Sequence, residues 1–281
     1  MAVVQGTQHL PYEVAVTLAV AALTAVGFFA DRLQGGLTRD ASALIGGDAV
    51  VSSDHALPAA FEARARELGL TSTQTLGFPT MGRARDEEGG AARLVALKAV
   101  DQGYPLRGTM RVAEAQGAPD SATRDIPAPG TAWVDEALLV SLNLKIGDPL
   151  LLGDTSLRIA RILVVEPDRG GGFMSFAPRV MLNAADLPAS GLVQPASRLT
   201  YRLAVAGDTA RVSDFSRWVD EELKKPGARG MRLESLEGGR PEMQQTLARA
   251  EKFLNLVALL AALLCAVAVA IAALGYAARH L

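Results

Sequence analysis

The side chains with the greatest chemical potential form short charged clusters. Glu166, Asp168 and Arg169 follow a predicted strand and stand beside a run of glycines, residues 170–172. This composition is compatible with an acidic site on a flexible glycine loop. Solvated turns share the same composition, however, and we interpret the cluster as a solvated turn. The acidic run at residues 86–88 is interpreted for the same reason as a charged loop tip, balanced by the arginines beside it.

Histidine and carboxylate side chains do not combine into a recognisable metal site. His9, His55 and His280 lie far apart in the sequence, and no H-E-x-x-H motif is present. Asp48 and Asp54 stand near His55 and resemble a metal cluster superficially, but their spacing matches no established ligand pattern. We therefore expect no metal-binding residues.

Known catalytic and nucleotide-binding motifs are also absent from the sequence. It contains no G-x-x-x-x-G-K-[ST], no G-x-G-x-x-G and no G-x-S-x-G. Covalent catalysis needs a nucleophile and a base, and His55 is the single histidine between the two apolar segments described below. A net charge of −2 leaves no basic excess to neutralise nucleic-acid phosphates. We expect a non-enzymatic chain with no catalytic residue and no bound cofactor.

Two apolar segments indicate a membrane protein. Residues 253–276 hold no charged side chain and would extend roughly 36 Å as a helix, enough to cross a bilayer core. Residues 14–30 form a shorter apolar segment. A cleaved signal peptide would need a basic region before it, whereas the first basic residue is Arg32. We predict two transmembrane helices, at 14–30 and 253–276.

The 222 residues between these segments predict an α+β domain in three parts. Residues 31–127 would form its first segment: the first helix continues to Gly46-Gly47, and a strand, a helix and three further strands follow at 48–53, 58–68, 71–77, 93–100 and 108–113. A glycine- and proline-rich linker follows at 115–130.

A small β-rich subdomain is predicted to be inserted at residues 128–196. It would hold a helix and three strands, at 135–142, 149–152, 156–165 and 180–183. The first part then resumes at 197–252, with a strand, a helix and a last strand at 198–205, 209–224 and 231–236. From Pro241, a helix runs without a breaker into the second apolar segment.

Several longer stretches carry a resemblance to a known family. They are residues 97–101 (Leu-Lys-Ala-Val-Asp), 103–108 (Gly-Tyr-Pro-Leu-Arg-Gly), 166–170 (Glu-Pro-Asp-Arg-Gly), 177–181 (Ala-Pro-Arg-Val-Met), 192–195, 239–243 and 249–254. Together they resemble the N-terminal portion of large FtsX-like/MacB-type ABC transporter permeases. The resemblance covers the chain from about Ala19 onward.

The resemblance implies a fold, a location and partners. The domain would be a MacB-like periplasmic domain, with a porter-like α+β part and the inserted β-rich part, in a multi-pass protein of the bacterial inner membrane. A cytoplasmic ABC ATPase subunit would bind ATP and drive mechanotransmission through the membrane helices. The substrate would be hydrophobic or lipid-like, and a periplasmic thioesterase or lysophospholipase would be a companion.

The chain departs from this family pattern in its length. Family members carry further spans, so we expect this chain to be an N-terminal fragment. The alternative is a membrane-anchored periplasmic binding or sensor domain, as in receptors that carry such a module between two helices.

Overall fold

The computed structural model describes residues 10–170, 176–194 and 197–235, together with single residues and pairs between 252 and 270. The chain divides into two units, one of residues 1–38 and 240–281 and one of residues 39–239. Helix α1 (Leu10–Ile45) begins in the first unit and ends in the second.

The end of α1 agrees with the sequence prediction. The backbone N–H groups of Gly46 and Gly47 donate to the carbonyls of Ala43 and Ser42 at 3.2 and 3.1 Å. Gly46 has a φ of +78°, the left-handed conformation that commonly terminates helices. The helix therefore stops at the predicted glycine pair.

The structure leaves the predicted membrane spans as predictions. Within the part of the chain that it describes, no helix is both long and apolar enough to cross a membrane. Most of the predicted span 253–276 and the predicted helix start at Pro241 lie outside the described residues.

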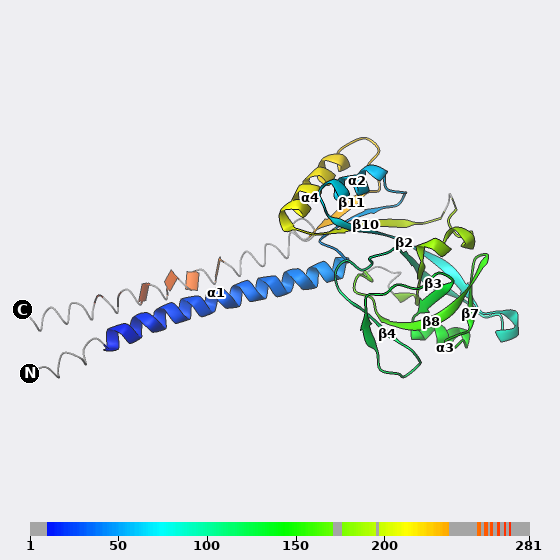
Figure 1. Cartoon of the computed structure of the whole chain (residues 1–281), viewed down its shortest axis with the longest axis horizontal. Helices are drawn as coiled ribbons and strands as arrows, with labels where there is room; N and C mark the ends of the chain where they lie inside the picture. Colours follow the sequence, from blue (N-terminus) through cyan, green and yellow to red (C-terminus); the bar gives the residue numbers. More distant parts are fainter. Residues whose placement is uncertain are drawn as a thin grey trace, which may run out of the picture. The chain divides into compact units, whose positions relative to one another are not determined.

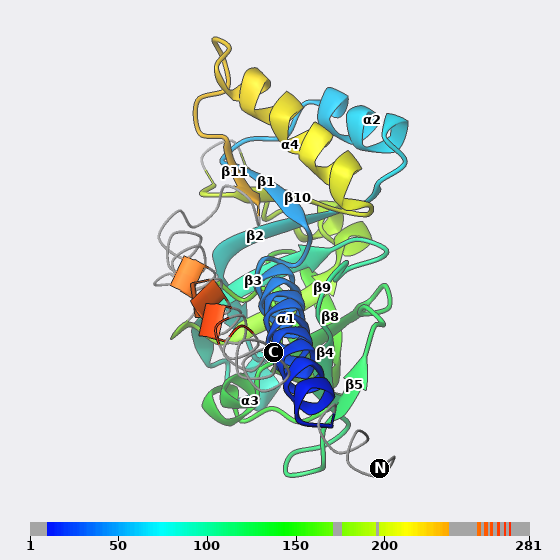
Figure 2. The same ribbon diagram turned by 90° about the vertical axis from the view of Figure 1, so that its left-hand side faces the viewer.

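A layer of sheet and helices forms one part of the unit 39–239. Its strands are β1 (Ala49–Ser53), β10 (Thr200–Ala206), β11 (Arg232–Ser235) and the first half of β2 (Thr71–Arg83). Strand β1 lies between β10 and β11 and pairs antiparallel with both. Helices α2 (Ala59–Glu67) and α4 (Thr209–Leu223) pack together on this sheet (Figures 1 and 2), with Phe61 and Phe215 in the shared core.

Six strands form a closed ring beside this layer. They pair in the order β2, β3 (Ala92–Val100), β9 (Arg179–Asn183), β6 (Thr131–Val134), β8 (Thr155–Val165) and β7 (Pro149–Leu152). Because β7 also pairs with the end of β2, the ring closes on itself. Helix α3 (Glu136–Leu142) contributes Leu138, Leu139 and Leu142 to the core of the ring.

A hairpin covers part of the ring's outer face. Strands β4 (Met110–Ala113) and β5 (Ser121–Thr123) pair with each other, and β4 pairs with the end of β8. A separate apolar cluster there includes Met110, Trp133 and Met181. Strand β5 lies within the predicted linker 115–130. The expectation of an irregular linker is therefore wrong at these three residues, which pair with β4.

The predicted α+β class is confirmed. Between residues 46 and 235, the predicted strands and helices recur with shifts of a few residues at their ends, most in β2, which continues to Arg83. Among the described residues, short 3-10 turns lie at Asp86–Glu88, Ala184–Asp186 and Pro188–Ser190. The division of the domain at residues 127 and 196 stays a prediction. The ring itself takes β2 and β3 from one side of residue 127 and its other four strands from the opposite side.

Candidate functional site

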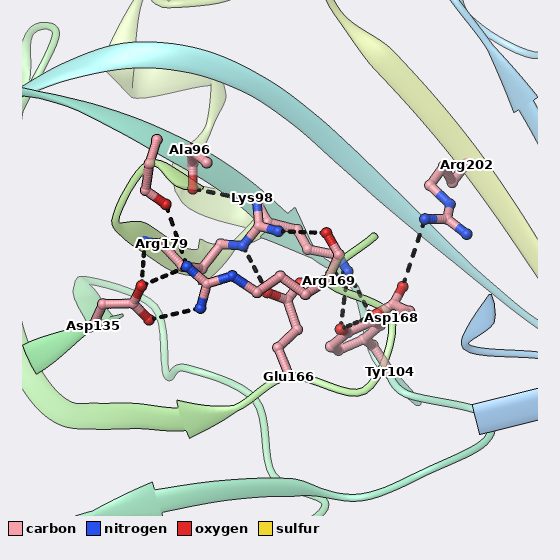
Figure 3. A network of polar contacts seen from close by, with 10 residues as sticks. Ala96, Lys98, Tyr104, Asp135, Glu166, Asp168, Arg169, Arg179 and Arg202 are labelled. Atoms are coloured by element: carbon pink, nitrogen blue, oxygen red, sulfur yellow. Dashed lines mark hydrogen bonds and ion pairs between the residues drawn. The ribbon is translucent and has the colours of Figure 1, made fainter. Parts of the chain in front are cut away.

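The candidate site begins with a lysine on the outer face of a ring strand. Leu97 and Ala99 on β3 point into the core of the ring, so the alternation of the strand turns Lys98 away from it. Lys98 is nevertheless only 5% exposed. Its Nζ donates to the Tyr104 hydroxyl at 2.9 Å, to Glu166 Oε1 at 2.8 Å and to Asp168 Oδ1 at 2.8 Å (Figure 3). These bonds use all three ammonium donors.

The two carboxylates come from the turn that follows β8. Glu166 is 7% exposed and Asp168 is 5% exposed. The interpretation of this cluster as a solvated turn is therefore wrong. Distant cations satisfy the carboxylates: Lys98 bonds to both, and Arg179 Nε on β9 donates to Glu166 Oε2 at 2.6 Å. Burial is compatible with charge here because each carboxylate is paired and hydrogen-bonded.

A second carboxylate–arginine group extends the network toward α3. Arg169 forks onto Asp135, with nitrogen–oxygen distances of 3.2 and 2.6 Å. Asp135 also accepts from the backbone N–H of Arg179 at 2.9 Å, and Arg179 Nη2 donates to the carbonyl of Arg169 at 3.2 Å. Since Asp135 immediately precedes α3, these bonds fix the start of that helix against β9.

Arg202 on β10 links the network to α1. Its Nη2 donates to the carbonyl of Ile45, the last residue of α1, at 3.1 Å. Its Nη1 lies 3.9 Å from Asp168 Oδ2, and Glu234 Oε2 on β11 lies 3.6 Å from its Nη2. Figure 3 shows Arg202 and Asp135 at opposite ends of the network. One arginine therefore connects the end of α1, the sheet layer and the buried carboxylates.

A clamp just after α1 adds a second attachment. Arg107 binds Asp48 through two bonds of 2.8 and 2.7 Å, and Asp48 also accepts from the backbone N–H of Gly207 at 3.0 Å. Hydrogen bonding to Asp48 raises the pKa of Arg107. Gly108 is packed so tightly that a Cβ there would lie 2.7 Å from Pro167 and 3.2 Å from Ala43.

The surroundings of Tyr104 and Asp168 shift the pKa values of these two groups in opposite directions. Burial, followed by the charges of Asp168 and Glu166, raises the pKa of Tyr104 well above its ordinary value. Burial alone would raise the pKa of Asp168, but the charges of Lys98 and Arg202 and the hydrogen bonds outweigh it and lower this pKa. At neutral pH the tyrosine is a neutral donor to Asp168 and the aspartate is charged.

The arrangement of paired charges is suited to holding separate segments of the domain together. The Lys98 donors are all engaged, and the buried carboxylates face cations on several sides. Within the described residues, no group of three or more histidine, cysteine, aspartate or glutamate side chains could hold a metal ion. Buried ion pairs add little stability relative to well-packed apolar groups, but removing one partner is strongly destabilising. Such a network fixes the relative positions of the segments that carry its charged groups.

The other candidate residues stay apart from this site. His55 pairs with the exposed Asp54 at 2.7 Å, whereas Asp48 binds Arg107, so the three do not form a cluster. Asp86 is exposed and pairs with Arg83 at 3.1 Å, which confirms the charged loop tip.

Sequence reasoning missed the role of Lys98, Tyr104, Asp135, Arg179 and Arg202. One local signal existed, since Lys98 is the only charged residue in the apolar run 94–100. The stretches that carry the family resemblance also hold six network members: Lys98, Tyr104, Glu166, Asp168, Arg169 and Arg179. The structure brings these separate stretches together at one place.

Comparison with known proteins tests the family resemblance that the sequence motifs indicate. No family model matches the chain. Its sequence is 36% identical over 258 residues to the uncharacterized ABC transporter permease YbbP of Escherichia coli K12. The match covers 92% of this chain and 30% of the relative, so the chain spans about a third of the relative's length. The resemblance to ABC transporter permeases that the sequence motifs indicate is thereby confirmed.

Solved structures show more distant similarity. The periplasmic region of MacB from Actinobacillus actinomycetemcomitans is 9% identical with a TM-score of 0.40, and the match covers 74% of this chain and 95% of that one. The extracellular domain of the ABC-type transporter YknZ from Gram-positive bacteria is 8% identical with a TM-score of 0.42, covering 66% and 98%.

Proposed function

We propose, from the relationship of this chain to ABC transporter permeases, that it forms part of the membrane subunit of a transporter of the mechanotransmission type. In this proposal residues 14–30, which lie within α1, and the apolar segment 253–276 cross the bacterial inner membrane, and the domain between them is periplasmic. A separate cytoplasmic ATPase subunit binds ATP and drives the movement. The substrate is hydrophobic or lipid-like, and a periplasmic thioesterase or lysophospholipase is a companion.

Within the structure, the single observation that supports mechanotransmission is the attachment at the end of α1. Arg202 holds the carbonyl of Ile45, and Arg107 holds Asp48 three residues later. A helix that relays movement must be joined firmly to the part it moves. Two charge-assisted attachments within four residues provide such a junction, because hydrogen bonds to charged groups are roughly twice as strong as neutral ones.

Co-purification tests the assignment. The chain would be expressed with its genomic neighbours, extracted in detergent and isolated through a tag on this chain. A stoichiometric ATPase subunit is the expected result. A folded chain that brings down no ATPase would contradict the proposal and would favour the membrane-anchored sensor domain instead.

A variant of the junction tests the mechanism in that complex. Arg202→Gln removes the charge that joins Ile45 to Asp168. We therefore expect the ATPase subunit to stay bound, whereas the change in its rate of ATP hydrolysis under transport conditions should fall at least several-fold. Asp86→Lys is the matched control, because Asp86 lies on the exposed loop tip, where its side chain pairs with Arg83 at 3.1 Å, and it is not part of the junction at α1. Equal ATPase responses in both variants would show that the junction does not transmit movement.

A further inference from the structure

An open groove lies on the outer face of the ring where β6 and β8 run in parallel. Its volume is about 580 Å³, within the range of small-ligand sites. Thr131 and Trp133 of β6 and Ala160 of β8 line it, whereas their neighbours Ala132 and Ile159 point into the core. Strand alternation therefore places the groove on the side opposite the core.

A β-bulge brings two arginines of β8 to this face. Thr131 lies opposite Arg158 and Ala132 opposite Ile159, but Trp133 lies opposite Arg161. Ala160 is therefore an extra residue in β8. Regular alternation would turn side chains three residues apart to opposite faces, yet Arg158 and Arg161 both line the groove. Bulges that re-aim a side chain in this way are over-represented beside functional sites.

The two β8 arginines differ in their partners. Arg161 Nε lies 2.9 Å from Glu114 Oε1, and its Nη1 lies 3.8 Å from Asp125 Oδ2. Its guanidinium also stands 5.5 Å from the centre of the Trp133 ring, at cation–π distance. Arg161 is therefore held in place, and its charge is largely balanced.

The other two arginines of the groove have no such acidic partners among the described residues. Arg124, from the loop after β5, and Arg158 both line the groove and are exposed. In the part of the chain that the structure describes, neither has a carboxylate within ion-pair distance. Asp125 is the one acidic residue of the lining, and it faces Arg161. The groove thus presents two guanidinium groups without a counter-charge.

We propose that this groove binds the phosphate group of an anionic ligand through Arg124 and Arg158. A guanidinium offers a rigid fork of donors that matches phosphate geometry. A phosphate presents three acceptor oxygens, enough for both arginines and for the amide of Gln102, which lines the same groove. Free phosphate and a phospholipid headgroup share this chemistry. The site stands independently of the transport proposal, because none of its residues belongs to the junction at α1.

Calorimetric titration of the full chain in a non-ionic detergent tests the site. The probes are inorganic phosphate, glycerol 1-phosphate and short-chain dihexanoylphosphatidylglycerol. We expect at least one probe to bind, and Arg124→Gln or Arg158→Gln to weaken its affinity about tenfold each, equivalent to about 1.4 kcal/mol. Arg229→Gln, which alters an exposed arginine between α4 and β11, is the control and should leave the affinity unchanged.

The probes also distinguish the sources of the phosphate. Similar affinities for all three would assign the site to free phosphate, and preference for the phosphatidylglycerol would assign it to a lipid headgroup. The proposal would be overturned if no probe bound the wild-type chain. It would also be overturned if the Arg124→Gln/Arg158→Gln double variant, with unchanged thermal unfolding, bound within twofold of the wild type.

Discussion

Replacing Lys98 by methionine is the sharpest test of the buried network. The side chains are similar in length, so the substitution removes the charge while nearly keeping the volume. Lys98 Nζ lies 2.8 Å from both Glu166 and Asp168, and its side chain is 7% exposed while theirs are 0% and 5% exposed. Solvent therefore cannot compensate the carboxylates that lose their cation.

The expected magnitude follows from this burial. Removing one partner of a buried ion pair costs about 3–5 kcal/mol, because an uncompensated charge is left inside. For a unit of this size, each 1 kcal/mol shifts the melting temperature by about 2–4 °C, so Lys98→Met should lower it by about 6–20 °C. Near-ultraviolet circular dichroism of the full chain, which reports on Trp133 and Trp218, measures this transition.

Two companion variants make the prediction refutable. Lys98→Met/Asp168→Asn removes one charge of each sign and should recover at least about 1 kcal/mol of the loss, since contacting residues are not additive. Lys145→Met, at an exposed lysine, should change stability by less than about 0.5 kcal/mol. A folded Lys98→Met variant that loses less than about 1 kcal/mol would refute the reasoning that the network depends on this charge.

Two more predictions concern the same region. Gly46→Ala should cost at least about 1 kcal/mol in thermal unfolding, because Gly46 has a φ of +78° and a Cβ there would lie 2.9 Å from Asp168 Oδ2; an unchanged melting temperature would contradict this packing. The raised pKa of Tyr104 predicts that stability is unaffected below about pH 10 and falls as pH rises beyond it, since the unfolded tyrosine releases its proton first. Tyr104→Phe should flatten that fall in unfolding free energy measured between about pH 9 and 11, and an equally steep fall would count against the assignment.

Features that depend on a few neighbouring residues could be predicted from the sequence. Apolar and polar residues alternate along 198–205, which turns Leu203 and Val205 to one face, and both are buried in the core shared with α4. The cap of α4 was also foreseeable, because Asp208 has the side chain that caps helices, and it accepts from the N–H groups of Ala210 and Arg211. The end of α1 at a glycine pair belongs to the same class.

Tertiary pairing was beyond such reasoning. The ring closes because β7 meets β2, and no periodicity in either strand indicates that contact. Glu166 and Asp168 stand beside glycines and look solvated in the sequence. Their partner Lys98 is separated from them by 68 and 70 residues. Burial of a carboxylate is decided by cations that the fold brings to it, and local composition does not contain that information.

The proposed relay of movement through α1 offers a physical reason for the placement of the buried charges. An apolar contact between Ile45 and the ring would be at least as stabilising, because buried ion pairs gain little over well-packed apolar residues. Apolar surfaces can slide past one another, however, whereas a guanidinium that joins the Ile45 carbonyl at 3.1 Å to Asp168 holds one geometry. The charged network is therefore less stabilising than an apolar contact, but it defines the position of the helix end. On this argument, an apolar replacement of the whole network should fold well and should fail selectively in relaying movement.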